Sequence, residues 1–316
     1  MRRSIIVGVD GSSESTDAAV VAASLARRLD RRLVLAHVAA NPNVFHYGDR
    51  GHRDVQRRHV LDAGNDLLES VAGEIDERTA ERRVVIGQLG TDRLANSLAM
   101  LTREERADLL VVGSRPRHPV GRALLGGPAG SPTAWLASQS ACPVVVVPRG
   151  AGRRFEEHQA QAGSIVCGVD GSPGSDRARV VASDLANRLG VSVLPVFATH
   201  SHDVGKDGDV LHVTGSNPAA TLGEVATWSR APLLVVGMRA AEARRRSVSR
   251  RLASRAPVPV VIVPPGARLP RFTPDRTTEP VVTARRRQAH APPSPSIDAR
   301  ERALISEGYE RLRHLV

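Results

Sequence analysis

A loop rich in glycine and arginine runs from Gly113 to Ser131 and has the composition of a phosphate-binding loop. It follows the apolar run 109–112, which reads as a buried strand, and it leads into a predicted helix that starts near Thr133. Glycines let backbone N–H groups turn toward a ligand, and a helix N-terminus adds unpaired donors with a partial positive charge. Arg115 adds a side chain that can bind phosphate. The alternative is an ordinary surface loop.

The elements that position this loop belong to an internal repeat. Four segments of the first half recur in the same order in the second half: residues 4–12 as 164–172, 20–29 as 180–189, 109–113 as 233–237 and 143–148 as 259–264. The offset falls from 160 to 124 and then to 116, so the second copy lacks 36 residues between its second and fourth strands and 8 more in the loop. We therefore predict a tandem duplication, whose halves are called the first and second repeat.

Short apolar runs alternate with helical spacing, which predicts a parallel sheet covered on both faces. In the first repeat we expect strands near 4–10, 33–39, 83–87, 108–113 and 143–148, and helices near 14–29, 52–77, 91–103 and 132–140. In the second repeat we expect strands near 164–170, 191–197, 210–214, 232–237 and 259–263, with no helix that matches 52–77.

The remaining segments are polar. Residues 151–163 read as a linker, and residues 266–296, rich in Pro, Arg and Thr, read as disordered. Residues 297–316 recover helical spacing, which predicts either an amphipathic helix that docks on the protein or a partner, or a frayed solvated helix. Its apolar positions are Leu304, Ile305, Tyr309, Leu312, Leu315 and Val316. The predicted domains are 1–150, 164–265 and a basic tail, 266–316.

Composition limits the classes of function. The chain has 316 residues and a net charge of +11, which suits phosphate or nucleic acid. Lys206 is the only lysine, so the arginine excess is spread along the whole chain and can equally reflect genome composition. Cys142 and Cys167 belong to no motif, and we expect reduced, buried thiols. No apolar run reaches about 20 residues, so we expect no transmembrane helix and a cytoplasmic protein.

Three features together resemble a tandem universal stress protein. These are the opening strand that ends in Asp-Gly-Ser (6–12), the strand that enters the glycine loop (107–115), and Gly130-Ser131 followed by 141–147. The resemblance covers roughly 1–150 and 164–265 and implies an α/β fold of two tandem five-stranded parallel-sheet sandwiches. It also implies pairing through the last strand of each repeat, as an intramolecular pseudo-dimer or a homodimer, and a stress-response role with an unidentified protein partner.

The family contains members that hold ATP in a pattern of Gly, two residues, Gly, nine residues, Gly and Ser or Thr. The first repeat has Pro116 in place of the second glycine, and thirteen residues then precede Gly130. The resemblance still implies ATP, with Mg²⁺, in the first repeat, held by Asp10, Val38, Gly113, Arg115, Gly130, Ser131 and Thr133. Asp10 would face adenine or ribose, and the backbone of Val38 would read the adenine edge. The alternatives are helix capping for Asp10, core packing for Val38 and a solvated side chain for Arg115.

The second repeat has no glycine between Gly237 and Ser247, where an arginine cluster stands instead. We interpret it as a non-binding partner domain whose basic face is solvated, and we do not expect nucleic acid to bind. Neither a nucleophile elbow nor a Walker lysine occurs, so at most slow ATP hydrolysis is expected. Residues 200–203 contain two histidines without a completing metal motif. A nucleotide-free interaction module is the alternative function, favoured by Pro116 and the longer loop.

Overall fold

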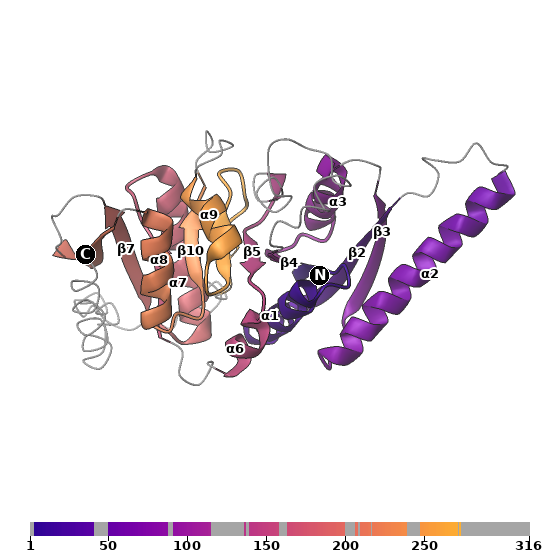
Figure 1. Ribbon diagram of the computed structural model, residues 1–316, viewed down its shortest axis with the longest axis horizontal. Helices are drawn as coiled ribbons and strands as arrows, with labels where there is room; N and C mark the ends of the chain where they lie inside the picture. Colours follow the sequence, from indigo (N-terminus) through magenta and orange to yellow (C-terminus); the bar gives the residue numbers. More distant parts are fainter. Residues whose placement is uncertain are drawn as a thin grey trace, which may run out of the picture.

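The computed structural model describes residues 3–40, 50–87, 91–114, 136, 139–157, 163–199, 206–207, 209–215, 217–238, 247–270 and 272. They form one sheet with helices on both faces (Figure 1). The first repeat consists of β1 (Ser4–Gly8), α1 (Ser13–Leu29), β2 (Arg32–Ala40), α2 (Arg50–Glu74), β3 (Glu81–Gly87), α3 (Thr91–Glu104), β4 (Leu109–Gly113), β5 (Val144–Val147) and α6 (Ala151–Glu157). Of the helix expected near 132–140, the structure describes Leu136 and Gln139, which are helical, and Ser140, which is not.

The second repeat follows the same order, except that the short strand β8, and no described helix, lies between its second strand and the strand that matches β3. It consists of β6 (Ile165–Gly168), α7 (Pro173–Leu189), β7 (Val193–Thr199), β8 (Lys206–Asp207), β9 (Val210–Thr214), α8 (Pro218–Trp228), β10 (Leu234–Gly237), α9 (Val248–Arg255) and β11 (Val260–Val263). The sequence did not predict β8, a two-residue strand that pairs antiparallel with β9 at the edge of the sheet. Between β7 and β9 the described residues contain no helix, as the sequence predicts.

The two repeats meet through their last strands. The strand order is β3-β2-β1-β4-β5-β11-β10-β6-β7-β9-β8. Pairing is parallel among β1 to β5, whereas β5 and β11 pair antiparallel with Val145 opposite Val261. These two valines are equivalent in the repeat, so a pseudo-twofold axis passes between them. The expected pairing of the last strands is confirmed, and each strand covers the edge that the other would expose.

Alternation along the strands divides the core between the two faces. Ile5 and Val7 of β1 point to the face that α1, α2 and α7 cover, whereas Ile6 points to the other face, which α3, α8 and α9 cover. All three side chains are fully buried, and each stabilises the fold by roughly 1.5–3 kcal/mol relative to an exposed position. The α1 face forms one buried cluster that runs through both repeats, so the repeats share a core as well as a sheet.

The segment after β5 is not the polar linker that the sequence suggests. Residues 151–157 form α6, which packs on α1 with Ala151 and Phe155 buried. The carboxylate of Asp17 in α1 accepts hydrogen bonds from the backbone N–H groups of Gly150 and Gly152, at 2.5 and 3.0 Å. An acidic side chain thus caps the start of α6, where unpaired N–H groups and the helix dipole favour negative charge.

The segment after β11, called here the strap (residues 264–270 and 272), occupies the equivalent place in the second repeat. Arg177, the counterpart of Asp17, donates a hydrogen bond to the carbonyl of Ala267. Arg268 crosses to the first repeat, where its N–H binds the carbonyl of Ala141 at 2.8 Å and its guanidinium binds that of Arg106 at 3.0 Å. The tail expected from residue 266 therefore begins after the strap, and residues 273–316 lie outside the described part of the chain.

Both thiols are buried in strands or beside them. Desolvation raises the pKa of Cys142 and of Cys167 from 9.0 to about 12. We expect each thiol in the native protein to react with a thiol reagent at pH 8 at least about 1000-fold more slowly than in the unfolded chain, because the thiolate fraction falls tenfold per pKa unit. The raised native pKa values also make the free energy of unfolding depend on pH. The contribution of the two neutral thiols to that free energy should be fully present below pH 9 and should fall as the pH rises from 9 toward 12. Thiol titration with and without urea tests this, and rapid labelling of a native thiol contradicts it.

Candidate functional site

The carboxyl ends of β1, β2 and β4 meet at one edge of the sheet. The chain places β2 and β3 on one side of β1 and then crosses to β4 on the other, so the strand order reverses between β1 and β4. Open α/β sheets bind ligands in the crevice at such a point. Three of the predicted site residues lie at this edge: Asp10 directly beyond β1, Val38 near the end of β2 and Gly113 at the end of β4.

Asp10 is exposed and takes part in a local turn. Its Oδ1 accepts hydrogen bonds from the N–H of Ser12, at 3.0 Å, and from the Ser12 hydroxyl. Ser12 is itself the N-cap of α1, so the cap is Ser12 and Asp10 supports it. Asp170 makes the same turn in the second repeat, where its Oδ1 accepts a hydrogen bond from the N–H of Ser172 at 3.0 Å. The turn is therefore common to both repeats, and a ligand site in the first repeat needs further residues that the second repeat lacks.

Gly113 is required by packing alone. A Cβ added there would lie 2.5 Å from the backbone oxygen of Glu14, in the first turn of α1. The second repeat has the same close approach, because a Cβ at Gly237 would lie 2.1 Å from the oxygen of Gly174. The backbone N–H of Ser114 continues the ladder beyond β4 by binding the carbonyl of Val147 at 2.8 Å. This packing holds the end of β4 against the N-terminus of α1, which is the base of the crevice.

Val38 is half-buried, and its side chain packs against β3. A Cβ on Gly87 would lie 2.9 Å from Val38 Cγ1, so the valine fills the space above that glycine. The described contacts of Val38 are thus those of the core-packing alternative. Its backbone contact with adenine stays a prediction.

Two further residues border the crevice, and the sequence reasoning missed them. His37 points to the opposite face from Val38, and its Nδ1 lies 2.8 Å from the carbonyl of Val9. Leu67 of α2 reaches within 3.5 Å of the Cβ position at Gly11, the turn glycine with a φ of +80°. A polar residue in an otherwise apolar strand was the available signal for His37. The Leu67 contact brings α2 beside the turn that follows β1, at the same edge of the sheet as Asp10.

The loop residues fall outside the described part of the chain. Arg115, Gly130, Ser131 and Thr133 all belong to this group, so their roles stay predictions. The offset of 116 makes Ser247 the counterpart of Ser131. Ser247 is the N-cap of α9, and its hydroxyl accepts a hydrogen bond from the N–H of Arg250 at 3.3 Å.

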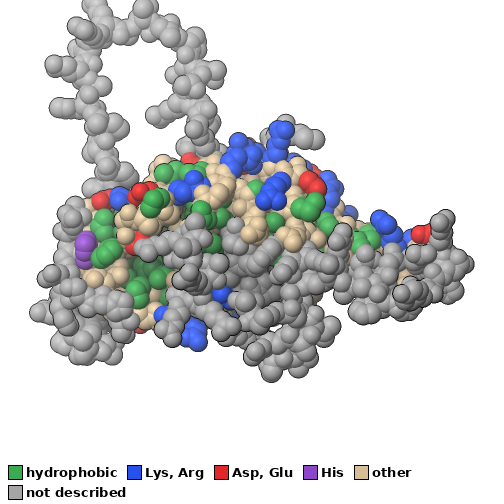
Figure 2. Space-filling view, turned by 90° about the horizontal axis from the view of Figure 1, so that it is seen from above, with side chains coloured by type: hydrophobic (Ala, Val, Ile, Leu, Met, Phe, Trp, Pro, Cys, Tyr) green, Lys and Arg blue, Asp and Glu red, His purple; other side chains and the backbone are tan. Residues whose placement is uncertain are grey.

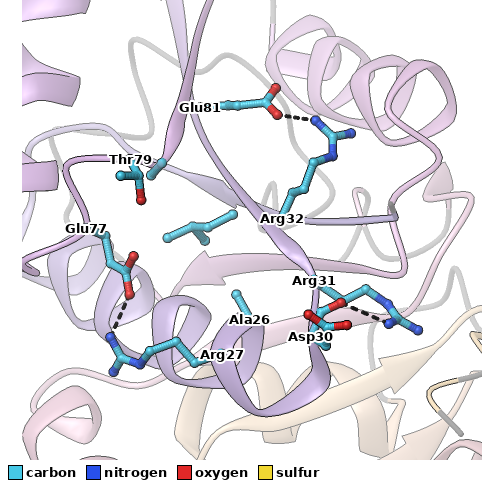
Figure 3. A pocket seen from close by; sticks show the side chains of 10 residues that line it. Ala26, Arg27, Asp30, Arg31, Arg32, Glu77, Thr79 and Glu81 are labelled. Carbon is cyan, nitrogen blue, oxygen red and sulfur yellow. Dashed lines mark hydrogen bonds and ion pairs between the residues drawn. The ribbon is translucent and has the colours of Figure 1, made fainter. Parts of the chain in front are cut away.

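A separate hollow of about 250 Å³ lies at the opposite edge of the sheet, between the C-terminal end of α1 and the starts of β2 and β3 (Figure 3). Arg27 pairs there with Glu77 at 2.6 Å, and Arg32 pairs with Glu81. The hydrogen bond to Glu81 raises the pKa of Arg32 above its usual value. Carboxylates already pair with these two arginines, and the C-terminus of α1 favours cations beside it. The arginines of the hollow therefore have a structural role. The hollow lies at the opposite edge of the sheet from Asp10 and Gly113.

Figure 2 shows the charged side chains on one face of the described part of the molecule. Arginine side chains occur at several separate places with acidic side chains among them (Figure 2). Among the described residues no group of three or more His, Cys, Asp or Glu side chains is arranged to hold a metal ion. Residues 200–203 lie outside those residues. A search of the helices in the same part of the chain finds none that is both long and apolar enough to cross a membrane.

Comparison with known proteins agrees with this architecture. The model of the "Universal stress protein family" matches residues 1–148 and 202–264. The chain belongs to the universal stress protein family. Universal stress protein Rv2005c of Mycobacterium tuberculosis is 29% identical over 196 residues, which cover 61% of this chain and 63% of that protein. The match thus spans under two thirds of the length of this curated relative.

Solved structures of the family share the fold. A universal stress protein from Archaeoglobus fulgidus superposes with a TM-score of 0.60 at 14% identity, over 83% of this chain and 98% of its own. A universal stress protein solved in complex with cAMP matches 47% of this chain and 99% of its own, at 24% identity and a TM-score of 0.33. The first of these likenesses supports the two-repeat architecture, and the second carries no weight in the argument below.

Proposed function

We propose that this universal stress protein binds an adenine nucleotide, ATP with Mg²⁺ in the first instance, in the crevice of the first repeat. The proposal rests on one asymmetry between the repeats. Both have the same Asx turn and the same glycine at the end of the fourth strand, but only the first adds α2 beside this turn and a glycine- and arginine-rich loop after Gly113. The second repeat is then a scaffold that pairs with the first.

The proposed roles follow from the chemistry of each side chain. The carboxylate of Asp10 accepts hydrogen bonds from ribose hydroxyls or adenine, and Arg115 binds phosphate oxygens with charge-assisted hydrogen bonds. Gly130, Ser131 and Thr133 supply backbone and hydroxyl donors at the start of the following helix. Mg²⁺ would neutralise phosphate charge. Binding, with a regulatory effect on a protein partner, is the proposed activity.

A matched pair of variants tests the proposal. Asp10→Ala should weaken binding of Mg-ATP about tenfold, or about 1.4 kcal/mol, because it removes an acceptor for the nucleoside. Asp170→Ala removes the same turn from the second repeat and should leave affinity unchanged. Isothermal titration calorimetry with ATP, ADP, AMP and cAMP measures both, and thermal unfolding checks that the two variants lose similar stability.

Two results would overturn the proposal. One is the absence of binding by the folded wild-type protein for all four nucleotides. The other is equal weakening by Asp10→Ala and Asp170→Ala. The first result would favour the nucleotide-free interaction module, which Pro116 and Pro132 already support because neither residue has a backbone N–H for phosphate.

A further inference from the structure

The two repeats differ most at the outer strands, where the first repeat carries α2 over the α1 side of the sheet (Figure 1). Leu68, Val71 and Ala72 of α2 are buried against this face. Gly64 marks the closest approach of the helix to the sheet. A Cβ at Gly64 would lie 2.9 Å from Val84 on β3 and 3.2 Å from His37 on β2.

The second repeat has the same sheet face without a described helix over its outer strands. The offset of 160 makes Phe197 of β7 the counterpart of His37. Phe197 pairs across the strands with His212, as His37 pairs with Val84. The two rings lie 5.2 Å apart, are half-buried, and belong to neither buried cluster. Since ten residues separate β7 from β9, the chain has no room there for a helix like α2.

The C-terminal segment shares part of the apolar pattern of α2. Gly308 stands in the place of Gly64, and the positions at −4, −3, +4, +7 and +8 from the glycine are apolar in both segments. They are Val60, Leu61, Leu68, Val71 and Ala72 in α2, and Leu304, Ile305, Leu312, Leu315 and Val316 in the C-terminal segment. In a helix these positions share one face with the glycine. In α2 the last three of these positions are buried, whereas Leu67 at +3, which also packs against the α1-side cluster, has Arg311 in its place. The segment lies after β11, whereas α2 follows β2, so the two do not match in chain order.

The described chain ends on the required face of the sheet. Phe272 is 2% exposed within the α1-side cluster, and its N–H donates to Asp184 of α7 at 2.6 Å. In the strand order, β6, β7 and β9 lie in succession beyond β10, and neighbouring strands are about 4.8 Å apart. The 31 residues from 273 to 303 span up to about 100 Å when extended, far more than this distance.

We propose that residues 304–316 dock as a helix on the α1-side face of β7 and β9, in the place that α2 occupies in the first repeat. Gly308 would then lie over the Phe197–His212 pair, and Leu312, Leu315 and Val316 would complete the core of the second repeat. The occupant is the chain's own C-terminal segment. The proposal is independent of nucleotide binding.

Hydrogen exchange of the full chain, read on peptides that cover β7 and β9, tests the docking. Leu312→Asp places a charge on the apolar face and should speed exchange in β9 at least tenfold. Arg313→Asp is the matched control, because its counterpart Glu69 is exposed in α2, and it should change nothing. Unchanged exchange in Leu312→Asp overturns the proposal. So does a dimer in light scattering that Leu312→Asp dissociates, because a second copy would then cover the face.

A second pair of variants distinguishes docking from a frayed helix. Gly308→Val adds a side chain where the helix would approach the rings most closely, so it should speed exchange in β9. Phe197→Ala opens space below and should at least halve that effect in the double variant. A solvated helix predicts no effect of Gly308→Val, since valine favours a helix over glycine, and that result also overturns the proposal.

Discussion

Replacing Asp108 with alanine is expected to lower the free energy of unfolding by about 3 kcal/mol, near the lower end of the range for breaking a buried ion pair. The carboxylate is fully buried and binds Arg3 Nη1 at 2.9 Å and Arg31 Nε at 2.7 Å. The variant leaves both guanidinium groups without their carboxylate. Arg31 is only 15% exposed and stays poorly hydrated without its carboxylate, which makes the loss large. Arg3 is 41% exposed and recovers hydration, which keeps the loss near the lower end of the range.

Urea denaturation at pH 7 measures this loss. Asp209→Ala is the control, because Asp209 is 70% exposed in its ion pair with Arg179 and its loss should cost less than about 0.5 kcal/mol. A loss below 1 kcal/mol in Asp108→Ala would contradict the assignment of Asp108 as the anchor at the amino ends of β1, β2 and β4.

The strands and the long helices were predictable because each depends on its own sequence. The expected strand 143–148 is Val144–Val147, and the expected helix 14–29 is Ser13–Leu29. The pairing of the last strands was implied by the family resemblance and covers two apolar edges that would otherwise face water; its antiparallel direction comes from the structure. The internal repeat supported these predictions, because each of the four matching segments occurs twice in the same order.

α6 and the strap were not predictable for the opposite reason. The sequence of α6 is mostly polar and that of the strap is rich in proline, and contacts with residues far away in the chain hold them, among them Asp17 for α6 and Arg177 for the strap. The charge differs between these two equivalent positions, and so does the backbone group that each binds: N–H groups for the acid and a carbonyl for the arginine. A pattern search sees only that arginine has replaced aspartate.

For the site, the family resemblance implied that Asp10, Val38 and Gly113 surround one ligand, and all three lie at one edge of the sheet. The packing demand on Gly113 was not visible, because it comes from the carbonyl of Glu14 on another element. That demand recurs at Gly237, so a glycine at this position does not distinguish a binding repeat from a non-binding one. In the proposed function, the residues that distinguish the first repeat are those of the loop and of α2.

Replacing Phe272 with alanine is expected to lower the free energy of unfolding by about 3 to 5 kcal/mol, the usual cost of truncating a buried phenylalanine. The ring is 2% exposed and lies in the cluster that both repeats share, with the guanidinium carbon of Arg31 5.5 Å from its centroid. Because Arg31 also binds Asp108, the variants Phe272→Ala and Asp108→Ala should be non-additive by at least about 0.5 kcal/mol.

The same urea series measures Phe272→Ala, the double variant and a control, Val180→Ala, whose side chain is 53% exposed on α7 and should change stability by less than about 0.5 kcal/mol. A small loss in Phe272→Ala would mean that the strap is not a structural part of the second repeat. A large loss would mean that the folded second repeat extends beyond residue 265, to at least Phe272. Phe272 itself lies in the buried cluster on the α1 side of the sheet.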